Sequence, residues 1–185
     1  MNTANNILKL TSLLEENSAA IIKFLKSFTF QKGGTIYTCG NGGSATQAMH
    51  LTEELLGKYD KPRASIPSVC LNSCAATLTC IANDFGYENV FSRQIEALAE
   101  PNDTLVLFTT SGNSNNIYKA ILAAGEKKCQ VILLNGKDGG QARWLTMNDY
   151  SIKELLVNGD NSARIQEVHE FVMHELVEKA ERELL

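Results

Sequence analysis

The sequence predicts an α/β fold, a three-layer, doubly wound and mainly parallel sheet of five strands flanked by helices. Short apolar, β-branched runs alternate along the chain with longer segments in which apolar residues recur every three or four positions. That alternation is typical of a parallel sheet covered by helices. The clearest run, residues 104–109, is almost continuously apolar, as expected of a strand that is buried on both faces.

The elements follow in order along the chain. The expected strands are residues 35–38, 68–72, 104–109, 130–134 and 150–155, the last at an edge of the sheet. The expected helices are residues 5–30 with a break near Asn17 and Ser18, 43–58, 75–82, 90–98, 117–124 and 162–184, the last capped by Asn161 or Ser162. Turns are expected at residues 83–86 and 138–140 because of their Asn, Asp and Gly content.

The composition fits one domain, residues 1–185. The long apolar helices at its two ends are expected to pack on the core and at oligomer interfaces. Of the residues, 44% are hydrophobic and 21% charged, and the net charge is -4, which argues against a nucleic-acid surface. The five cysteines lack paired spacing and indicate reduced thiols rather than a disulfide framework. We find no signal-peptide pattern and no apolar run long enough for a membrane span, and expect a cytoplasmic protein.

A glycine-rich turn follows the first strand and opens a helix. Gly40, Gly42 and Gly43 permit positive φ and close approach to the backbone, while the N–H groups of a helix start attract an anion. The hydroxyl of Ser44 could join that anion cradle. The alternative is an ordinary strand-to-helix turn in which Ser44 only caps the helix.

A second hydroxyl-rich turn, residues 110–116, follows the third strand in the same way. In parallel sheets, ligands bind beyond the carboxyl ends of the strands, where both turns would lie. Neither turn has the spacing of a P-loop or of the dinucleotide fingerprint. The two turns together predict a site for a small phosphoester.

Histidines and carboxylates mark a third feature. His50 and Glu54 are four residues apart, so one helix face presents both to a metal or a substrate, or merely to each other as a surface pair. Gln166 and His174 lie ~12 Å apart along the last helix, so a shared ligand requires their side chains to lean together. His169 lies nearer the apolar stripe and is expected in the core or an interface. The basic residues of the loop at 58–63 are expected to be solvated, with phosphate capping as the alternative.

Six motifs, in consistent order from about residue 33 onward, resemble the phosphoheptose isomerases of the sugar isomerase (SIS) domain superfamily, which have a flavodoxin-like fold. These motifs are Cys39–Ser44, Ala48–Glu54, Asn83–Gly86, Phe91–Arg93, Thr110–Ser114 and Arg164–His169. The resemblance implies a homotetramer that interconverts sedoheptulose 7-phosphate and D-glycero-D-manno-heptose 7-phosphate, the first step of bacterial heptose biosynthesis. It leaves open whether the heptose enters lipopolysaccharide or another glycan.

The resemblance also implies roles for individual residues. Glu54 is expected to be the general base and His174 its acid/base partner. One Zn²⁺ per subunit is expected at His50, Glu54, Gln166 and His174. Contacts to the substrate are expected from Asn41, Gly42, Gly43, Ser44, Glu54, Asn83, Asp84, Thr109, Thr110, Ser111, Ser114 and Gln166.

The chain departs from the family pattern at three positions. Thr109 stands where many relatives have Ser, Lys58 where Arg is common, and Ala163 where some have Asp. Lys58 keeps the positive charge but lacks the two-pronged guanidinium. Two other functions are open to this fold, a non-catalytic protein that binds the replication initiator and a phosphosugar-sensing module. Because the non-catalytic relatives lack the positions of Glu54 and His174, the sequence favours the enzyme.

Overall fold

The computed structural model describes residues 3–148 and 151–185 and contains one five-stranded sheet whose paired strands are all parallel. The strands lie in the order β2-β1-β3-β4-β5, which confirms the predicted fold class. Tyr150, where the last strand was expected to begin, lies outside the described residues. The strands are β1 (Ile36–Gly40), β2 (Ser68–Cys70), β3 (Thr104–Phe108), β4 (Gln130–Gly136) and β5 (Ile152–Val157).

The central strands divide their side chains between two separate hydrophobic cores. Val106 and Phe108 of β3 face one core, and Leu105 and Leu107 face the other. This alternation follows from the period of two residues in a β-strand. Because both faces are covered by helices, the strands read as continuous apolar runs rather than alternating ones.

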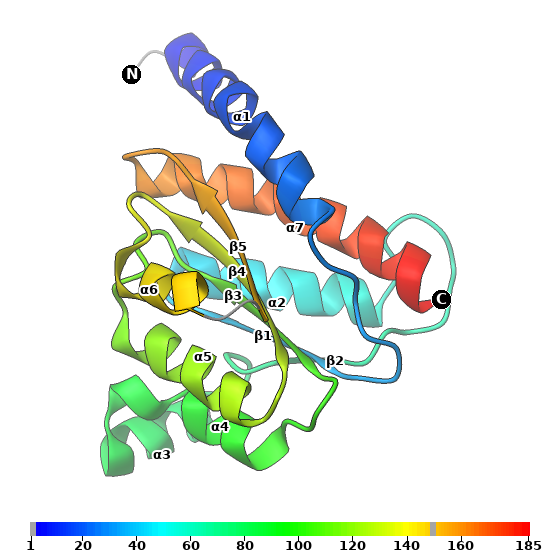
Figure 1. Cartoon of the computed structure of the whole chain (residues 1–185), viewed down its shortest axis with the longest axis vertical. Helices are drawn as coiled ribbons and strands as arrows, with labels where there is room; N and C mark the ends of the chain where they lie inside the picture. Colours follow the sequence, from blue (N-terminus) through cyan, green and yellow to red (C-terminus); the bar gives the residue numbers. More distant parts are fainter. Residues whose placement is uncertain (1–2, 149–150) are drawn as a thin grey trace.

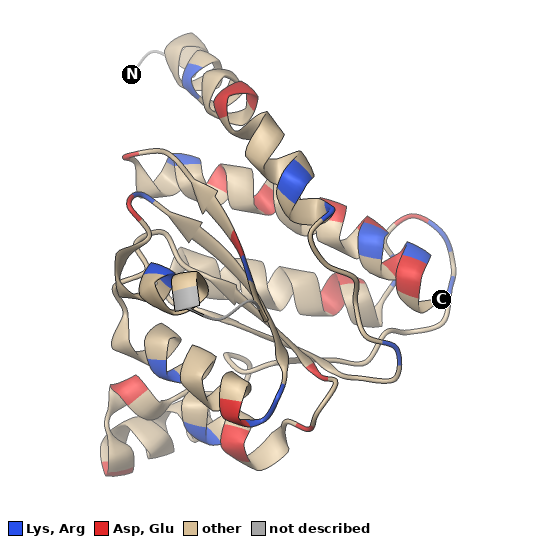
Figure 2. Ribbon diagram, viewed as in Figure 1, with Lys and Arg blue, Asp and Glu red and all other residues tan. Residues whose placement is uncertain are grey.

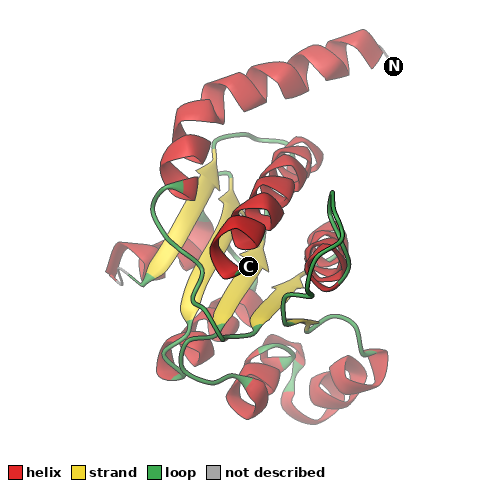
Figure 3. Cartoon of the chain, turned by 90° about the vertical axis from the view of Figure 1, so that its right-hand side faces the viewer, coloured by secondary structure: helices red, strands yellow, loops and turns green. Residues whose placement is uncertain are grey.

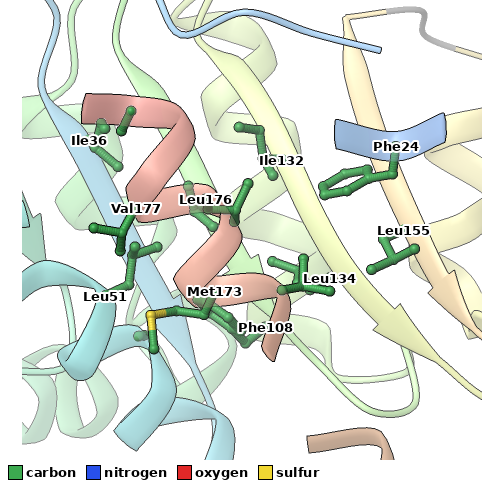
Figure 4. Packing of buried hydrophobic residues seen from close by; sticks show 14 of the residues in the cluster. Phe24, Ile36, Leu51, Phe108, Ile132, Leu134, Leu155, Met173, Leu176 and Val177 are labelled. Atoms are coloured by element: carbon green, nitrogen blue, oxygen red, sulfur yellow. The ribbon is translucent and has the colours of Figure 1, made fainter. Parts of the chain in front are cut away.

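Three helices cover one face of the sheet, α1 (Thr3–Leu25), α2 (Gly43–Leu56) and α7 (Ser162–Leu184), and all three contribute to one core. Figure 1 shows α2 and α7 side by side over this face, with the N-terminal half of α1 extending beyond it. In Figure 4, Met173, Leu176 and Val177 of α7 lie among Leu51 of α2 and Phe108 of β3. The predicted apolar stripe of α7 is confirmed, since its members Ile165, Val168, Val172, Leu176 and Ala180 are all buried.

The opposite face is covered by the helices between β2 and β5, so that the sheet lies between two layers of helices (Figure 3). These helices are α3 (Ala75–Phe85), the short 3₁₀ helix η1 (Tyr87–Asn89), α4 (Ser92–Leu98), α5 (Asn115–Glu126) and α6 (Gly140–Asn148). The helix α3 buries none of its residues and therefore adds little to the core.

The expected break in the N-terminal helix was wrong. A single helix runs from Thr3 to Leu25, and Asn17 lies buried within it. The Asn17 amide donates to the carbonyl of Leu13 at 2.8 Å and accepts from the backbone N–H of Asn158 at 3.0 Å. A polar side chain that suggested a helix end thus connects α1 to the segment after β5.

Several element limits also differ from the prediction. The helix α3 continues through Asn83 to Phe85, where a turn was expected, and α2 ends at Leu56 rather than near 58. The helix α6 begins at Gly140 and was not predicted. Asn161 caps α7, because its side chain accepts the N–H groups of Ala163 and Arg164.

Basic and acidic residues are interspersed along the helices and loops (Figure 2), as the small net charge suggests. None of the helices formed by residues 3–148 and 151–185 has the length and apolar character that crossing a membrane requires.

Candidate active site

The two polar turns lie next to each other, because β1 and β3 are neighbours in the sheet. Gly40 ends β1 opposite Phe108, which ends β3. From β1, the chain connects outward to β2 on one side, and from β3 outward to β4 and β5 on the other. A sheet of this order binds ligands beyond the carboxyl ends of these two strands, where its winding direction changes.

The first turn needs glycine for three separate reasons. Gly42 has φ 57° and precedes α2 as its N-cap. A Cβ on Gly40 would lie 2.5 Å from the carbonyl oxygen of Ser44, and one on Gly43 would lie 2.6 Å from Nε2 of Gln166. Ser44 is buried inside the first helical turn, so the capping role considered for it was wrong.

Asn41 lies beside a surface cavity of about 330 Å³ that is lined in part by Tyr87 and Ser114. Its amide exchanges two hydrogen bonds of 2.8 Å with the amide of Asn116 and accepts the hydroxyl of Tyr87 at 3.0 Å. These bonds join the first turn to η1 and α5. The sequence offered no signal for Tyr87 or Asn116, because their role depends on how these elements pack.

The second turn is held by its own hydroxyl groups. The Thr109 hydroxyl accepts the N–H groups of Ser111 and Gly112, at 3.5 and 3.1 Å, and the Thr110 hydroxyl donates to that of Ser162 at 3.2 Å. Ser114 is the N-cap of α5, and its side chain makes no capping hydrogen bond. Thr109 therefore shapes the turn, whereas Ser114 keeps its hydroxyl beside the helix start.

Asn83 and Asp84 lie on the exposed last turn of α3. The Asn83 amide donates to the carboxylate of Asp84 at 2.7 Å. Among the described residues, neither has a hydrogen bond to either of the two turns.

The predicted reactive residues meet between α2 and α7. Nε2 of His50 lies 3.5 Å from Oε1 of Glu54 and 3.7 Å from Oε1 of Glu53. The rings of His50 and His174 meet edge to face with their centroids 5.3 Å apart. Two helices that are far apart in sequence thus bring two imidazoles and a carboxylate together. The Glu54 side chain is 18% exposed.

Glu170 belongs to the same group of side chains and was not predicted. Its Oε1 lies 2.6 Å from Nδ1 of His50, and its Oε2 accepts the amide N–H of Gln47 at 3.1 Å. Positions 166, 170 and 174 are each four residues apart and share one face of α7. That spacing points to Glu170 once α7 is known to face α2.

Gln166 lies at the other end of this face. Its side-chain amide is beside Gly43 in the first turn, and its backbone carbonyl accepts the amide N–H of Gln47 at 2.7 Å. No hydrogen bond joins Gln166 to His50 or His174 among the described residues. The predicted four-residue set is therefore gathered on two facing helices, with Gln166 a turn or more from the histidines.

Tyr59 lies against the exposed end of this group, its ring inclined by 31° to that of His174 with centroids 5.6 Å apart. Burial, together with the carboxylates of Glu178, Glu175 and Glu54, raises the pKa of Tyr59 above its usual value. The phenol is protonated at neutral pH, as an ordinary tyrosine is, and can donate a hydrogen bond.

The donor set fits a divalent metal such as Zn²⁺, which binds imidazole nitrogen and carboxylate oxygen. Two ligands at ~2.1 Å from a tetrahedral ion lie about 3.4 Å apart, close to the 3.5 Å between Nε2 of His50 and Oε1 of Glu54. Ligand atoms of His50, Glu170 and His174 also lie within 4.8 Å of one another. These residues could hold a metal after small side-chain rotations.

His169, the third histidine, is fully buried in the core, as expected. Its Nε2 donates to the backbone carbonyl of Asn135 at 3.0 Å, while Nδ1 has no hydrogen-bond partner within residues 3–148 and 151–185. Burial lowers the pKa of His169 to about 4. The ring is neutral at pH 7 and has a structural role.

In the basic loop, the expectation of solvated side chains was wrong for Arg63. Its guanidinium pairs with Glu181 of α7 and donates to the carbonyls of Glu54 and Leu55 at the end of α2. Arg63 is thus a C-terminal cap for α2 that also fixes it to α7. Lys58 is exposed, as expected.

The fold and the two turns place the chain among proteins with a SIS domain, and that family matches residues 3–136. Phosphoheptose isomerase from Proteus mirabilis (strain HI4320) is 43% identical over 156 residues, 84% of this chain and 79% of the relative. Phosphoheptose isomerase from Geotalea daltonii is 40% identical over 171 residues, 92% and 86% of the two chains. The solved structure of a phosphoheptose isomerase from Francisella tularensis superposes with a TM-score of 0.86 at 31% identity, covering 98% of this chain and 100% of that one.

The chain therefore belongs to the phosphoheptose isomerase family. The resemblance noted from its motifs is confirmed.

Proposed function

We propose that the protein is an isomerase that interconverts sedoheptulose 7-phosphate and D-glycero-D-manno-heptose 7-phosphate. This proposal rests on the proximity of His50 and Glu54 of α2 to His174 of α7. His50 and Glu54 lie toward the C-terminal end of α2, and the first turn lies at its N-terminal end. His50 lies seven residues beyond Gly43, about 10 Å along the helix axis. That separation suits a linear sugar that extends along α2 from the first turn to the reactive residues.

Aldose–ketose isomerisation moves a proton between two neighbouring carbons and one between their oxygens. In the proposed mechanism, Glu54 removes the proton from one carbon, and the resulting enediol is reprotonated on the other. His174, across the site on α7, exchanges a proton with the substrate oxygens. The Tyr59 ring beside His174 limits the positions that this imidazole can take.

Zn²⁺ is proposed at His50, Glu54, Gln166 and His174, one ion per subunit. When bound, the ion would polarise the carbonyl and hold the substrate oxygens. A carboxylate that binds the metal tightly is a weaker base, so Glu54 cannot fulfil both roles completely at once. His50 and Glu54, whose Nε2 and Oε1 atoms lie 3.5 Å apart, would hold the ion from α2, and Glu54 would act as the base to the extent that the ion leaves its carboxylate free.

For the substrate, we propose that Ser111, Ser114 and Thr110 of the second turn hold the phosphate with the N-terminus of α5. Asn41, Gly42, Gly43 and Ser44 would enclose the sugar from the first turn, with Gln166 beside them. Thr109 would act by shaping the turn. Asn83 and Asp84 would reach the substrate only from the exposed end of α3.

A homotetramer in the cytoplasm is proposed from the family resemblance, and heptose synthesis for a bacterial glycan is the proposed pathway. Exposed apolar side chains on α1 and α7, among them Ile7, Leu8, Ile22 and Phe171, are available for contacts between copies. Light scattering coupled to size-exclusion chromatography is expected to give four times the chain mass of 20.3 kDa. A monomer at micromolar concentration would contradict the tetramer.

The activity is tested by incubating the purified protein with sedoheptulose 7-phosphate and following formation of the aldose. Glu54→Gln and His174→Ala are each expected to reduce turnover by at least about 10²-fold, the range of general acid–base catalysis, while circular dichroism stays unchanged. Glu175→Gln, a charge change on the same helix as His174, is the control. Near-normal turnover in both variants would refute the mechanism, and binding of substrate without turnover by the wild type would indicate a sensor.

A further inference from the structure

We propose that Glu170 is a positioning residue that fixes the tautomer and the ring orientation of His50. This inference rests on the proposed function, in which His50 is a metal ligand, and adds a residue that the family resemblance does not assign. It is carried by the 2.6 Å contact between Oε1 of Glu170 and Nδ1 of His50.

The contact determines which nitrogen of His50 carries the proton. An ionised carboxylate can only accept hydrogen bonds, so Nδ1 must be the donor. In the neutral imidazole, Nε2 is then left with its lone pair. Nε2 lies 3.5 Å from Oε1 of Glu54, so both atoms could bind a cation placed between them.

Glu170 is itself held in place. Its second oxygen accepts the amide N–H of Gln47 at 3.1 Å, and the same amide donates to the carbonyl of Gln166 at 2.7 Å. Gln47 is a buried residue of α2. Its amide connects α2 to two groups of α7, the Glu170 carboxylate and the Gln166 carbonyl. The resulting chain runs from Gln166 through Gln47 and Glu170 to His50, and keeps the ring from rotating about χ2.

Carboxylates that accept the second N–H of a metal-binding histidine orient the ring and raise its basicity. We therefore expect Glu170→Ala to weaken Zn²⁺ binding by about 10- to 100-fold. Glu170→Gln keeps a neutral acceptor next to Nδ1 and is expected to have an intermediate affinity. Among the described residues, Glu175 has no hydrogen-bond or ion-pair partner, so Glu175→Ala is the matched control for truncating a glutamate on α7.

The experiment has two readouts on the purified, metal-free protein. Heteronuclear NMR of the imidazole nitrogens reports the tautomer of His50, which we expect to be Nδ1–H in the wild type and a mixture in Glu170→Ala. Competition with a chromogenic chelator gives the affinity for Zn²⁺. Loss of affinity with an unchanged tautomer would make Glu170 a direct ligand and overturn the proposal, as would unchanged tautomer and affinity together.

The two proposals fail in different ways. If the wild type neither binds Zn²⁺ nor forms the aldose, the proposed function is wrong. The tautomer comparison between the wild type, Glu170→Ala and Glu175→Ala still decides the role of Glu170, because it requires neither metal nor substrate.

Discussion

At the scale of single residues, His169 shows how burial alone can make a histidine structural. It donates one hydrogen bond, to Asn135, and its ring packs against Phe108 with centroids 6.4 Å apart. It directly precedes Glu170 in the sequence, yet it faces the core rather than α2. Its contribution to stability is expected to depend on pH.

The pKa of His169 in the folded protein is about 4, below the unfolded value near 6.5, so the unfolded chain takes up a proton first as the pH falls. The contribution of the neutral His169 ring to the free energy of unfolding is present above pH 6.5 and is lost as the pH falls from 6.5 to 4. At pH 5.5 we expect a loss of about 1.4 kcal/mol relative to pH 7.5, measured by urea unfolding. His169→Gln should show a smaller loss over that interval, and an equal loss would assign the effect to other groups.

Substitution by alanine is expected to have opposite effects on stability at two glycines, Gly40 and Gly125. In Gly40→Ala the new Cβ would meet the backbone carbonyl of Ser44 at 2.5 Å, so the first turn must shift and the free energy of unfolding should decrease by several kcal/mol, an exceptional cost for one methyl group. In Gly125→Ala nothing lies within 4 Å, and helix propensity should add up to about 1 kcal/mol. Thermal unfolding of both variants tests the pair, and similar effects would contradict it.

At the scale of elements, Asn17 joins α1 to the segment after β5. Asn17→Ala leaves the N–H of Asn158 without its acceptor, and an unsatisfied, partly buried donor costs about 1 to 3 kcal/mol. Ser18→Ala, on the exposed side of the same helix, should change stability by no more than about 0.5 kcal/mol. Chemical denaturation gives both values. Equal effects would mean that helix propensity, and not the contact to Asn158, explains the loss.

The same residue illustrates what local sequence can predict. All five strands were found, because a strand covered on both faces must be an apolar run. The break at Asn17 was wrong because a polar residue inside a helix was read without knowing its partner 141 residues away. The helix α6 was missed because Gly139 and Gly140 indicate a turn, and Gly140 is also the first residue of the helix.

The candidate site likewise contains some residues that the sequence predicts and others that only the packing of the helices reveals. The pair of His50 and Glu54 follows from spacing on one helix, and the two turns follow from composition. Glu170 and Tyr59 depend on the register between α2, α7 and the loop after α2, which no local pattern contains. The spacing of four residues from Gln166 to Glu170 and on to His174 becomes informative only once α7 is known to face α2.

At the scale of the whole molecule, bound metal would connect α2 and α7 and so stabilise the fold. Zn²⁺ at 100 times its Kd would add ~2.7 kcal/mol, which for a chain of this length corresponds to roughly 5 to 10 °C in Tm. We expect chelation to reverse this shift, as measured by differential scanning fluorimetry. The double variant His50→Ala, His174→Ala should show no shift, and a shift of equal size in that variant would place the metal elsewhere.

The position of α7 has a consequence for the order in which the protein is made. All five strands precede α7 in the chain, so a ribosome has synthesised the entire sheet before this helix can cover Ile132 and Leu134 on one face. Until then the part of that face beneath α7 is uncovered, and α2 has no opposing Glu170 or His174. Completion of the core and assembly of the reactive group thus both wait for α7, and the proposed metal site between these helices cannot form before this helix has been synthesised.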